Sequence, residues 1–588
     1  MERNTMKIRT RMLALVLVLS FLLGLCGCLP VPTVQKGETA PEEELQTSEA
    51  GLSAREEAIE TLAADGYFTP LAREALSFDE MVLGEISLDE FTPYAQALTR
   101  AAEAESREAF HRACVEAERM LVRINTAGAL LEIESDRDAA DEARSTRADN
   151  QVQAYYDAMD LYDRTLCEIA SGDHAGMLDK EFAAWQIEYF RGYDAESSAQ
   201  SLYLTNQEAQ LVSQYALCSS QDEVDYERLT EIYLQLVSVR AEMAELAGAA
   251  NYSEYAYSAF YSRDYTPADA QKIWKTAKED FAPLLQKYTD SLTQALWKED
   301  LSAGECTEES IVQALCYGAA RMSPEIREAA EYLLDHQLYD ISYDRKKLST
   351  GYTTYLYSFD APFIFNCPDG SYTDYTDMFH EFGHWAAGYY HGSDPLYGVP
   401  DYDLSELQSQ GMEVMFLQFY DELFGTTAQV LRGETLLNLV YSVVTGAMYD
   451  EFQQRVYLEP ELSEERLLDI FREVYESYGF EIYDGYEYEW ADVIHNFQQP
   501  LYYISYAVSA IPALELYVQS VESPNEAMDT YLRVAGMSDE EYYLTDALRE
   551  TGLSNSMKSP IGDVIAQELE KSGAFDFENG SKEMRNTE

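Results

Sequence analysis

The stretch TDMFHEFGHWAAG, residues 376–388, places two histidines four residues apart, with a glutamate directly after the first. On a helix, residues four apart share one face, so His380 and His384 can direct ring nitrogens at one metal ion while Glu381 lies beside it. A chance meeting on a surface helix is the weaker interpretation, because the chain has only seven histidines. The spacing therefore predicts a metal site with an adjacent general base.

A catalytic zinc site needs a third protein ligand and an open fourth position. The downstream segment DLSELQSQGMEVMFLQFY, residues 403–420, places Glu406, Gln410 and Glu413 at i, i+4 and i+7 in an otherwise apolar helix. A buried acidic stripe is costly unless it is paired or bound to metal. We expect Glu406 to be the third ligand, with Gln410 and Glu413 orienting the histidines. A solvated acidic face is the alternative.

The elements around these helices are predicted from hydrophobic periodicity. Residues 351–370, GYTTYLYSFDAPFIFNCPDG, are rich in β-branched and aromatic residues, which predicts two short strands at about 352–358 and 362–367. The edge of such a sheet can hold an extended peptide by backbone hydrogen bonds. Helical spacing dominates from about 91 to 239, and a further helix is expected to begin after the N-cap Thr266. The predicted fold class is therefore mainly α.

The N-terminus has the regions of an export signal. MERNTMKIRTRMLALVLVLSFLLGLCGCLP begins with basic residues, continues as an apolar run and ends in small residues and cysteines. Its LCGC segment resembles a bacterial lipobox, so we expect a signal peptide over 1–27, a lipid on Cys28 and a Pro/Thr/Glu-rich tether over 28–55. An uncleaved membrane anchor is the alternative. In either case the body is expected outside the cytoplasmic membrane, and the resemblance to a lipobox favours a lipid-anchored bacterial lipoprotein.

Composition and charge narrow the function classes. The chain has 588 residues, of which 46% are hydrophobic and 25% charged, so it is expected to form a large globular body. A formal net charge of −65 argues against nucleic-acid binding, which depends on basic residues that neutralise phosphates. The six cysteines after the signal lack metal-ligand spacing, and export would allow one or two disulfides. The sequence does not indicate an oligomeric state.

HEFGH, SELQSQGME and HNFQQPLYYISYA (residues 495–507) together resemble the oligoendopeptidase F and thimet oligopeptidase family of zinc metallopeptidases. YSRDYTPADAQKIWKTAKEDFAPLLQKY and the strand APFIFN are similar to that family too. The resemblance covers about residues 60–570. It implies a two-lobed helical body with a deep central cleft and a small antiparallel sheet beside the zinc helix. We divide the chain into an N-terminal helical domain over 56–235, a catalytic domain over 236–575 and a polar tail over 576–588.

The resemblance also implies the roles of the site residues. The third ligand of the family falls on Glu406, which completes a site for one zinc ion with His380 and His384. The late His and Tyr cluster, which helps to stabilise the reacting carbonyl, falls on His495 and on Tyr502 or Tyr503. The predicted function is zinc-dependent cleavage of internal bonds in short unstructured peptides, with Glu381 taking a proton from the attacking water.

Two alternatives remain open at this stage. A dipeptidyl carboxypeptidase or metallocarboxypeptidase would need a basic residue that captures the terminal carboxylate, and no position for one is evident in this acid-rich chain. A lipid-anchored peptide-binding protein without catalysis is the other alternative. The segment 481–495 is interpreted either as a loop over the cleft or as aromatic core, and His391 as a helix-end residue rather than a ligand.

Overall fold

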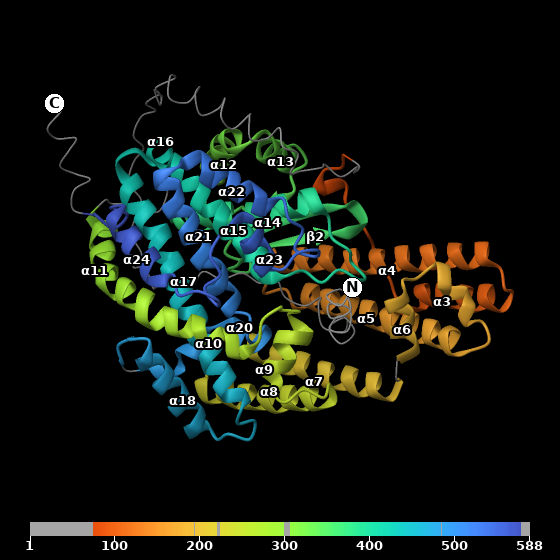
Figure 1. Ribbon diagram of the computed structural model, residues 1–588. Coiled ribbons are helices and arrows are strands. Elements are labelled where there is room, and N and C mark those ends of the chain that lie inside the picture. The colour runs from red at the N-terminus through yellow and green to blue at the C-terminus, as the bar shows by residue number, and fades with distance from the viewer. Residues whose placement is uncertain are drawn as a thin grey trace.

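The computed structural model describes residues 75–192, 195–219, 221, 224–298, 306–483 and 485–577. The predicted signal peptide, Cys28, the tether and most of the polar tail lie outside these residues. The described part of the chain is mainly helical, with one small sheet, as expected (Figure 1). Among its helices, none is both long enough and apolar enough to span a membrane.

The elements before the first histidine of the motif are α3 (Leu88–Glu103), α4 (Arg107–Asp136), α5 (Glu142–Ser171), α6 (Ala184–Gly192), α7 (Ala195–Ser219), α8 (Tyr226–Leu246), α9 (Tyr252–Tyr255), α10 (Pro267–Thr276), α11 (Ala282–Lys298), α12 (Glu308–Met322), α13 (Pro324–Asp335), β1 (Tyr339–Asp340), β2 (Gly351–Leu356) and β3 (Ala361–Asn366). The elements that follow are α14 (Thr373–His391), α15 (Tyr402–Phe416), α16 (Tyr420–Phe424), α17 (Ala428–Tyr457), α18 (Glu464–Ser477), α19 (Glu489–Asp492), α20 (Ile494–Gln498), α21 (Ile504–Glu522), α22 (Pro524–Ala535), α23 (Leu544–Thr551) and α24 (Gly562–Lys571).

The apolar side chains form two cores, which gives the body two lobes. The smaller core gathers buried residues of α3, α4, α5 and α6, which project to one side of the molecule (Figure 1). The larger core takes in the remaining helices and the sheet. Helix α4 enters both, because Leu121 and Ile124 lie in the smaller core while Ala129 and Ile133 lie in the larger. The predicted domain boundary at residue 235 and the deep cleft stay predictions.

Helix starts follow local side-chain chemistry. Thr266 caps α10 by accepting a hydrogen bond from the Asp269 backbone N–H (3.3 Å), while the Asp269 carboxylate accepts from the Thr266 N–H (3.2 Å). Pro267 follows as the first helical residue, where its missing N–H costs nothing. The predicted start of this helix is therefore confirmed.

The sheet has the strand order β1-β3-β2. The expected pair of strands is confirmed, since β2 and β3 run antiparallel with Thr353 opposite Ile364. The expectation of a purely antiparallel sheet is wrong, because β1 pairs with β3 in parallel. A two-residue strand such as β1 is too short to leave a periodic signal in the sequence. Every residue of the central strand β3 is buried, and β2 lies at the edge of the sheet.

The six body cysteines all fall within the described residues and are present as thiols. Cys114 is buried in the smaller core, as expected for a small apolar side chain. No disulfide joins any of these six cysteines.

Candidate metal centre

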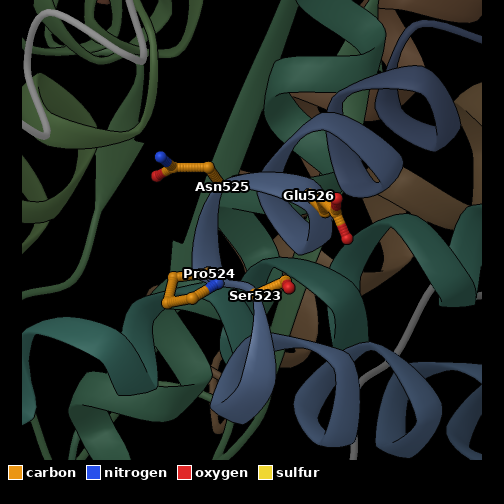
Figure 2. Close-up of a pocket in the computed structure, with 4 residues that line it drawn as sticks. All are labelled: Ser523, Pro524, Asn525 and Glu526. Carbon is orange, nitrogen blue, oxygen red and sulfur yellow. The ribbon is translucent and has the colours of Figure 1, made fainter.

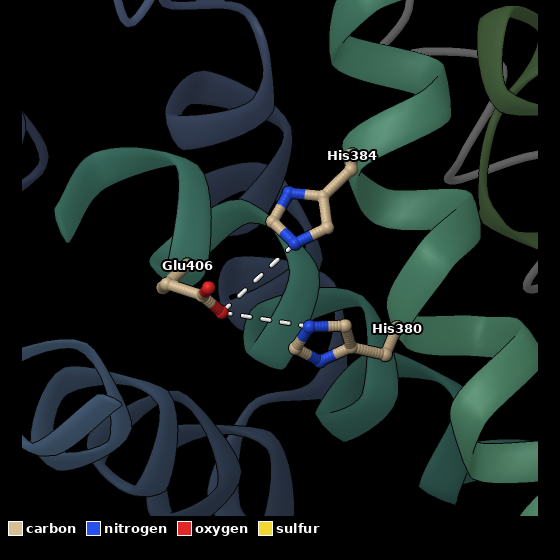
Figure 3. A group of neighbouring side chains, drawn as sticks. All are labelled: His380, His384 and Glu406. Carbon is tan, nitrogen blue, oxygen red and sulfur yellow. Dashed lines mark ion pairs between the residues drawn. The ribbon is translucent and has the colours of Figure 1, made fainter. Parts of the chain in front are cut away.

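Three side chains from two adjacent helices converge on one point (Figure 3). On α14, Nε2 of His380 lies 3.5 Å from Oε2 of Glu406 on α15, and Nε2 of His384 lies 3.9 Å from the same oxygen. Two donors that each lie about 2.0–2.2 Å from a zinc ion in a tetrahedral site are about 3.3–3.6 Å apart. The two imidazoles and the carboxylate therefore form a donor set that can hold a metal ion.

The outward ring nitrogens of both histidines have partners. His380 Nδ1 donates to Oε1 of Glu413 over 2.7 Å, and His384 Nδ1 lies 3.0 Å from Oγ of Ser405. Such contacts fix the ring orientation and leave Nε2 free for a ligand. Glu413 thus lies where the sequence predicted it, whereas Gln410 directs its amide toward the Tyr506 carbonyl (3.5 Å). Ser405 was missed, because a serine one residue before a ligand carries no signal of its own.

Glu381 lies beside the cluster and is held from the sheet. Its Oε2 accepts a hydrogen bond from the Thr353 hydroxyl on β2 over 2.7 Å, and the carboxyl is buried. Burial raises the pKa of Glu381, while the positive charge of His380 opposes that rise. A buried carboxyl of raised pKa, fixed by one hydrogen bond, is suited to exchange a proton with a nearby water. The role of Thr353 could not be read from the sequence, because the contact joins residues 28 apart.

His495 and the tyrosines that follow it lie next to one another, and Tyr502 contacts Glu406. The Tyr502 hydroxyl donates to Oε1 of Glu406 over 2.6 Å, so this carboxylate presents its other oxygen to the two histidines. The His495 ring packs against Tyr502, Tyr503 and Tyr506, with ring centroids 5.1–5.9 Å apart. The residues predicted as metal ligands and the late His and Tyr cluster therefore lie in one region, linked by the hydrogen bond from Tyr502 to Glu406. Tyr502 contacts the proposed ligand Glu406, whereas Tyr503 packs on the His495 ring, and which of them assists the reacting carbonyl stays a prediction.

His495 is poised as a neutral hydrogen-bonding group. It is buried, and this burial lowers its pKa to about 3. Its Nε2 lies 3.4 Å from the Tyr506 hydroxyl, and its Nδ1 has no hydrogen-bond partner within the described residues. A neutral imidazole carries one N–H, which can donate to a developing negative charge. Tyr506 was missed by the sequence analysis, although it stands only three residues beyond Tyr503.

Comparison with solved structures identifies proteins that share this fold. No family model matches the sequence, and no curated protein matches it. Among solved structures, the chain is similar to a protein described as an oligoendopeptidase F, with a TM-score of 0.71 and 20% identity over 86% of this chain and 100% of the other. The chain has the oligoendopeptidase F fold. It is also similar to PZ peptidase A with an inhibitor (TM-score 0.69, 20% identity, 86% and 100% covered). A carboxypeptidase of Pyrococcus furiosus follows (TM-score 0.53, 13% identity, 77% and 97% covered).

In this oligoendopeptidase F fold, a glycine sets the separation of the two ligand helices. A Cβ added to Gly383 on α14 would lie 2.5 Å from Cα of Ser409 and 2.9 Å from the carbonyl oxygen of Gln408, both on α15. Only a residue without Cβ allows the backbones to approach this closely. That approach is what brings Glu406 to the two histidines.

Replacing Gly383 with alanine should therefore push α14 and α15 apart. We expect a loss of about 1–3 kcal/mol of stability from the clash, together with weaker metal binding. The matched control is Gly388→Ala on the same helix, where the nearest atom, Cβ of Pro362, lies at 3.4 Å. Urea unfolding and metal titration of both variants make the comparison. Equal behaviour of the two would contradict the role given to the close contact.

Charges in the cluster are strongly coupled. Burial lowers the pKa of His380, but the hydrogen bond and charge of Glu413, with the charge of Glu406, raise it to about 10 overall. Burial and the charge of His380 hold the pKa of His384 well below its usual range. Burial raises the pKa of Glu406 to about 7. In the metal-free protein at neutral pH, His380 is therefore the protonated histidine of the pair.

Metal binding at neutral pH should release a proton from His380. A ligating histidine must be neutral, and the raised pKa means that the proton is bound at every pH below about 10. Metal affinity should therefore rise with pH through neutrality. Calorimetric titration at pH 7 in two buffers of different ionisation enthalpy should show release of at least about one proton per metal ion. Glu413→Gln removes the charge that raises this pKa, so it should release fewer protons, and an unchanged count would contradict the assignment.

Two other regions lie apart from the cluster. His391 is the last residue of α14 and contacts the Ala535 carbonyl oxygen through Nε2 over 3.0 Å, in agreement with its interpretation as a helix-end residue.

A surface pocket is lined by Ser523, Pro524, Asn525 and Glu526 at the start of α22 (Figure 2). Its lining comes from consecutive residues, and Figure 2 shows Asn525 and Glu526 pointing away from each other. It offers no converging set of chemical groups.

The tyrosine-rich segment 481–495 is aromatic core in part, whereas its interpretation as a loop over the cleft stays a prediction. Tyr486 and Trp490 are buried in the larger core, whereas the Tyr483 side chain is 54% exposed. The segment is thus anchored as core at its C-terminal half and exposed earlier.

Proposed function

We propose that the protein is a zinc-dependent oligoendopeptidase that hydrolyses internal bonds of short unstructured peptides. The observation that carries this proposal is the convergence of His380, His384 and Glu406 beside Glu381, within the fold of the oligoendopeptidase F structures. Two imidazoles and one carboxylate, with room for a water or substrate, are the ligands of catalytic zinc sites in peptidases. The similarity to PZ peptidase A supports a peptide as substrate.

Each residue of the site has a defined task in this chemistry. When bound, zinc lowers the pKa of a water and polarises the peptide carbonyl. Glu381 accepts the proton of the attacking water and then passes it to the amine that leaves. Thr353 keeps the Glu381 carboxylate oriented during both transfers. His495 donates its N–H to the carbonyl oxygen as negative charge develops there.

Replacing His495 with alanine should slow turnover while leaving metal bound. Loss of one donor to the developing oxyanion costs about 10²–10³ in kcat. His495 is not part of the ligand cluster, so the metal content of the variant should equal that of the parent. Steady-state kinetics with a quenched fluorescent peptide, together with metal analysis, give both values. A variant with normal kcat would remove His495 from the mechanism.

The function itself is tested by one digestion experiment. A peptide library of mixed lengths, half of it C-terminally amidated, is incubated with the protein with and without a chelator and read by mass spectrometry. We expect internal cleavage that stops on chelation, returns with zinc and does not depend on a free C-terminus. Cleavage restricted to free C-termini would instead favour a carboxypeptidase. Stoichiometric zinc without any cleavage would contradict the proposed function and favour a peptide-binding protein.

We further propose that the protein is exported and carries a lipid on Cys28. Support comes from the basic, apolar and small-residue regions that precede this cysteine. Expression in a bacterium with its own signal should give a membrane-associated protein that begins at residue 28. Cys28→Ser should leave the protein unlipidated, and a mature N-terminus elsewhere would contradict the proposal.

A further inference from the structure

The chain enters α21 through a conformation that leucine rarely adopts. Leu501, which directly precedes Tyr502, has φ +66° and is fully buried. A bulky residue in this left-handed region is an outlier that persists only where its surroundings hold it. The turn at Leu501 therefore depends on contacts from other elements, and Tyr502 takes its direction from that turn.

Both backbone groups of Leu501 are held by buried side chains. Its N–H donates to Oε1 of Gln453 on α17 over 2.6 Å, and its carbonyl oxygen accepts from Nη1 of Arg263 over 3.1 Å. Nη2 of Arg263 also donates to Oγ of Ser505 over 2.8 Å, in the first turn of α21. Arg263 thus forms hydrogen bonds with residues on both sides of Tyr502 in the sequence.

The Nε side of the Arg263 guanidinium faces α15, the helix that carries Glu406. Nε of Arg263 lies 3.5 Å from Oδ1 of Asp403, and both side chains are only 2% exposed. Asp403 stands in the first turn of α15, three residues before Glu406. Arg263 therefore links the two elements that meet in the hydrogen bond from Tyr502 to Glu406.

We propose that Arg263 is a positioning residue for the metal centre. By holding the turn at Leu501 against the start of α15, it sets the Tyr502 hydroxyl on Oε1 of Glu406, so that Oε2 is directed at the two histidines. The inference rests on the proposed function in one respect, since it takes zinc as the ion. Loss of Arg263 should therefore weaken zinc binding through Tyr502, although Arg263 itself contacts no ligand.

Zinc dissociation constants, measured by competition with a fluorescent chelator, test this link. Arg263→Met and Tyr502→Phe should each weaken zinc binding about 10-fold, the lower end of the effect of losing an outer partner of a ligand. The double variant should bind zinc no more weakly than either single one, because both changes remove the same hydrogen bond on Glu406. Additive losses would overturn the proposal.

A general loss of stability can be distinguished from a specific effect on zinc binding by removing both buried charges, those of Arg263 and Asp403, together. Arg263→Met alone leaves Asp403 buried without a counter-ion, whereas Arg263→Met/Asp403→Leu leaves neither charge and should recover much of the thermal stability. The weak zinc binding should persist in this double variant, because the bonds to Leu501 and Ser505 remain absent. Zinc binding equal to that of the parent would overturn the proposal. If Arg263→Met does not fold, Arg263→Lys keeps the charge but loses the forked contact, and it should show the same loss.

Arg240 offers a matched control. It is fully buried and holds the carbonyl oxygens of Asn496 and Phe497, with Glu208 of α7 as its ion partner. Arg240→Met should lower stability but leave zinc affinity within about 2-fold, because none of these partners belongs to α15. A parent that binds zinc without cleaving peptides contradicts the proposed function alone. If the unsubstituted protein cleaves peptides and Arg263→Met binds zinc as tightly as it does, this inference alone is wrong. If the unsubstituted protein binds no zinc, both the proposed function and this inference are wrong.

Discussion

Glu381→Gln should abolish peptide hydrolysis while the metal stays bound. The amide has the shape of the carboxylate and can still accept the hydrogen bond from Thr353, so the fold of the site should not change. It cannot accept a proton from water, and positioned proton transfer contributes about 10²–10⁴-fold to rates of this kind. All three ligands remain, so the ion should bind as in the parent. Metal content and catalysis are thereby separated in one substitution.

The measurement is kcat on a quenched fluorescent peptide, with metal content determined on the same sample. Asp374→Asn is a suitable control, because Asp374 is buried on the same helix but accepts hydrogen bonds from the backbone of Asp369 and Gly370 instead of entering the cluster. It should keep turnover even if stability falls. If Glu381→Gln hydrolyses peptides at close to the parent rate, the general base lies elsewhere and the proposed mechanism is wrong.

Glu406→Gln should act in the opposite way, through loss of the metal itself. A neutral amide replaces the charged ligand, and it must also find a new arrangement with Tyr502. The loss of affinity should exceed the roughly 10–100-fold that removal of an outer partner costs. Glu413→Gln provides that comparison, because Glu413 touches His380 but is not a ligand.

Zinc affinity is again measured by chelator competition, and Glu515→Gln serves as the control for removing a partly buried, hydrogen-bonded carboxylate. Glu515 lies on α21 and accepts hydrogen bonds from the backbone N–H and the hydroxyl of Ser554, at 2.8 and 2.9 Å. Its substitution should leave zinc binding unchanged. If Glu413→Gln weakens zinc binding as much as Glu406→Gln does, Glu406 does not act as a ligand.

The ligand cluster could be predicted from the sequence because its signals are local. Helix geometry alone puts His380 and His384 on one face, and a polar stripe in an apolar helix identified Glu406. The β2–β3 pair was equally visible, since β-branched and aromatic residues cluster there. In each case the informative residues lie within a few positions of one another.

The contacts that orient the cluster could not be predicted, because they join residues distant in the chain. Thr353 reaches Glu381 from the sheet, and Arg263 reaches Leu501 across 238 residues. The parallel strand β1 is invisible for the same reason, as its partner is known only once the chain has folded. The contact of Tyr502 with Glu406 likewise follows a turn with positive φ at Leu501, which no propensity favours for leucine.

Helix α4 has a mechanical consequence. Its 30 residues pass without interruption from the smaller core to the larger, and its last residue, Asp136, accepts a hydrogen bond from the Tyr352 hydroxyl over 2.8 Å. Tyr352 is the neighbour in β2 of Thr353, which holds Glu381. One unbroken helix therefore connects the smaller core to the edge strand β2. The place of the smaller lobe is thus tied to the strand position next to Thr353, so a substitution that shifts the end of α4 should also disturb the carboxylate of Glu381.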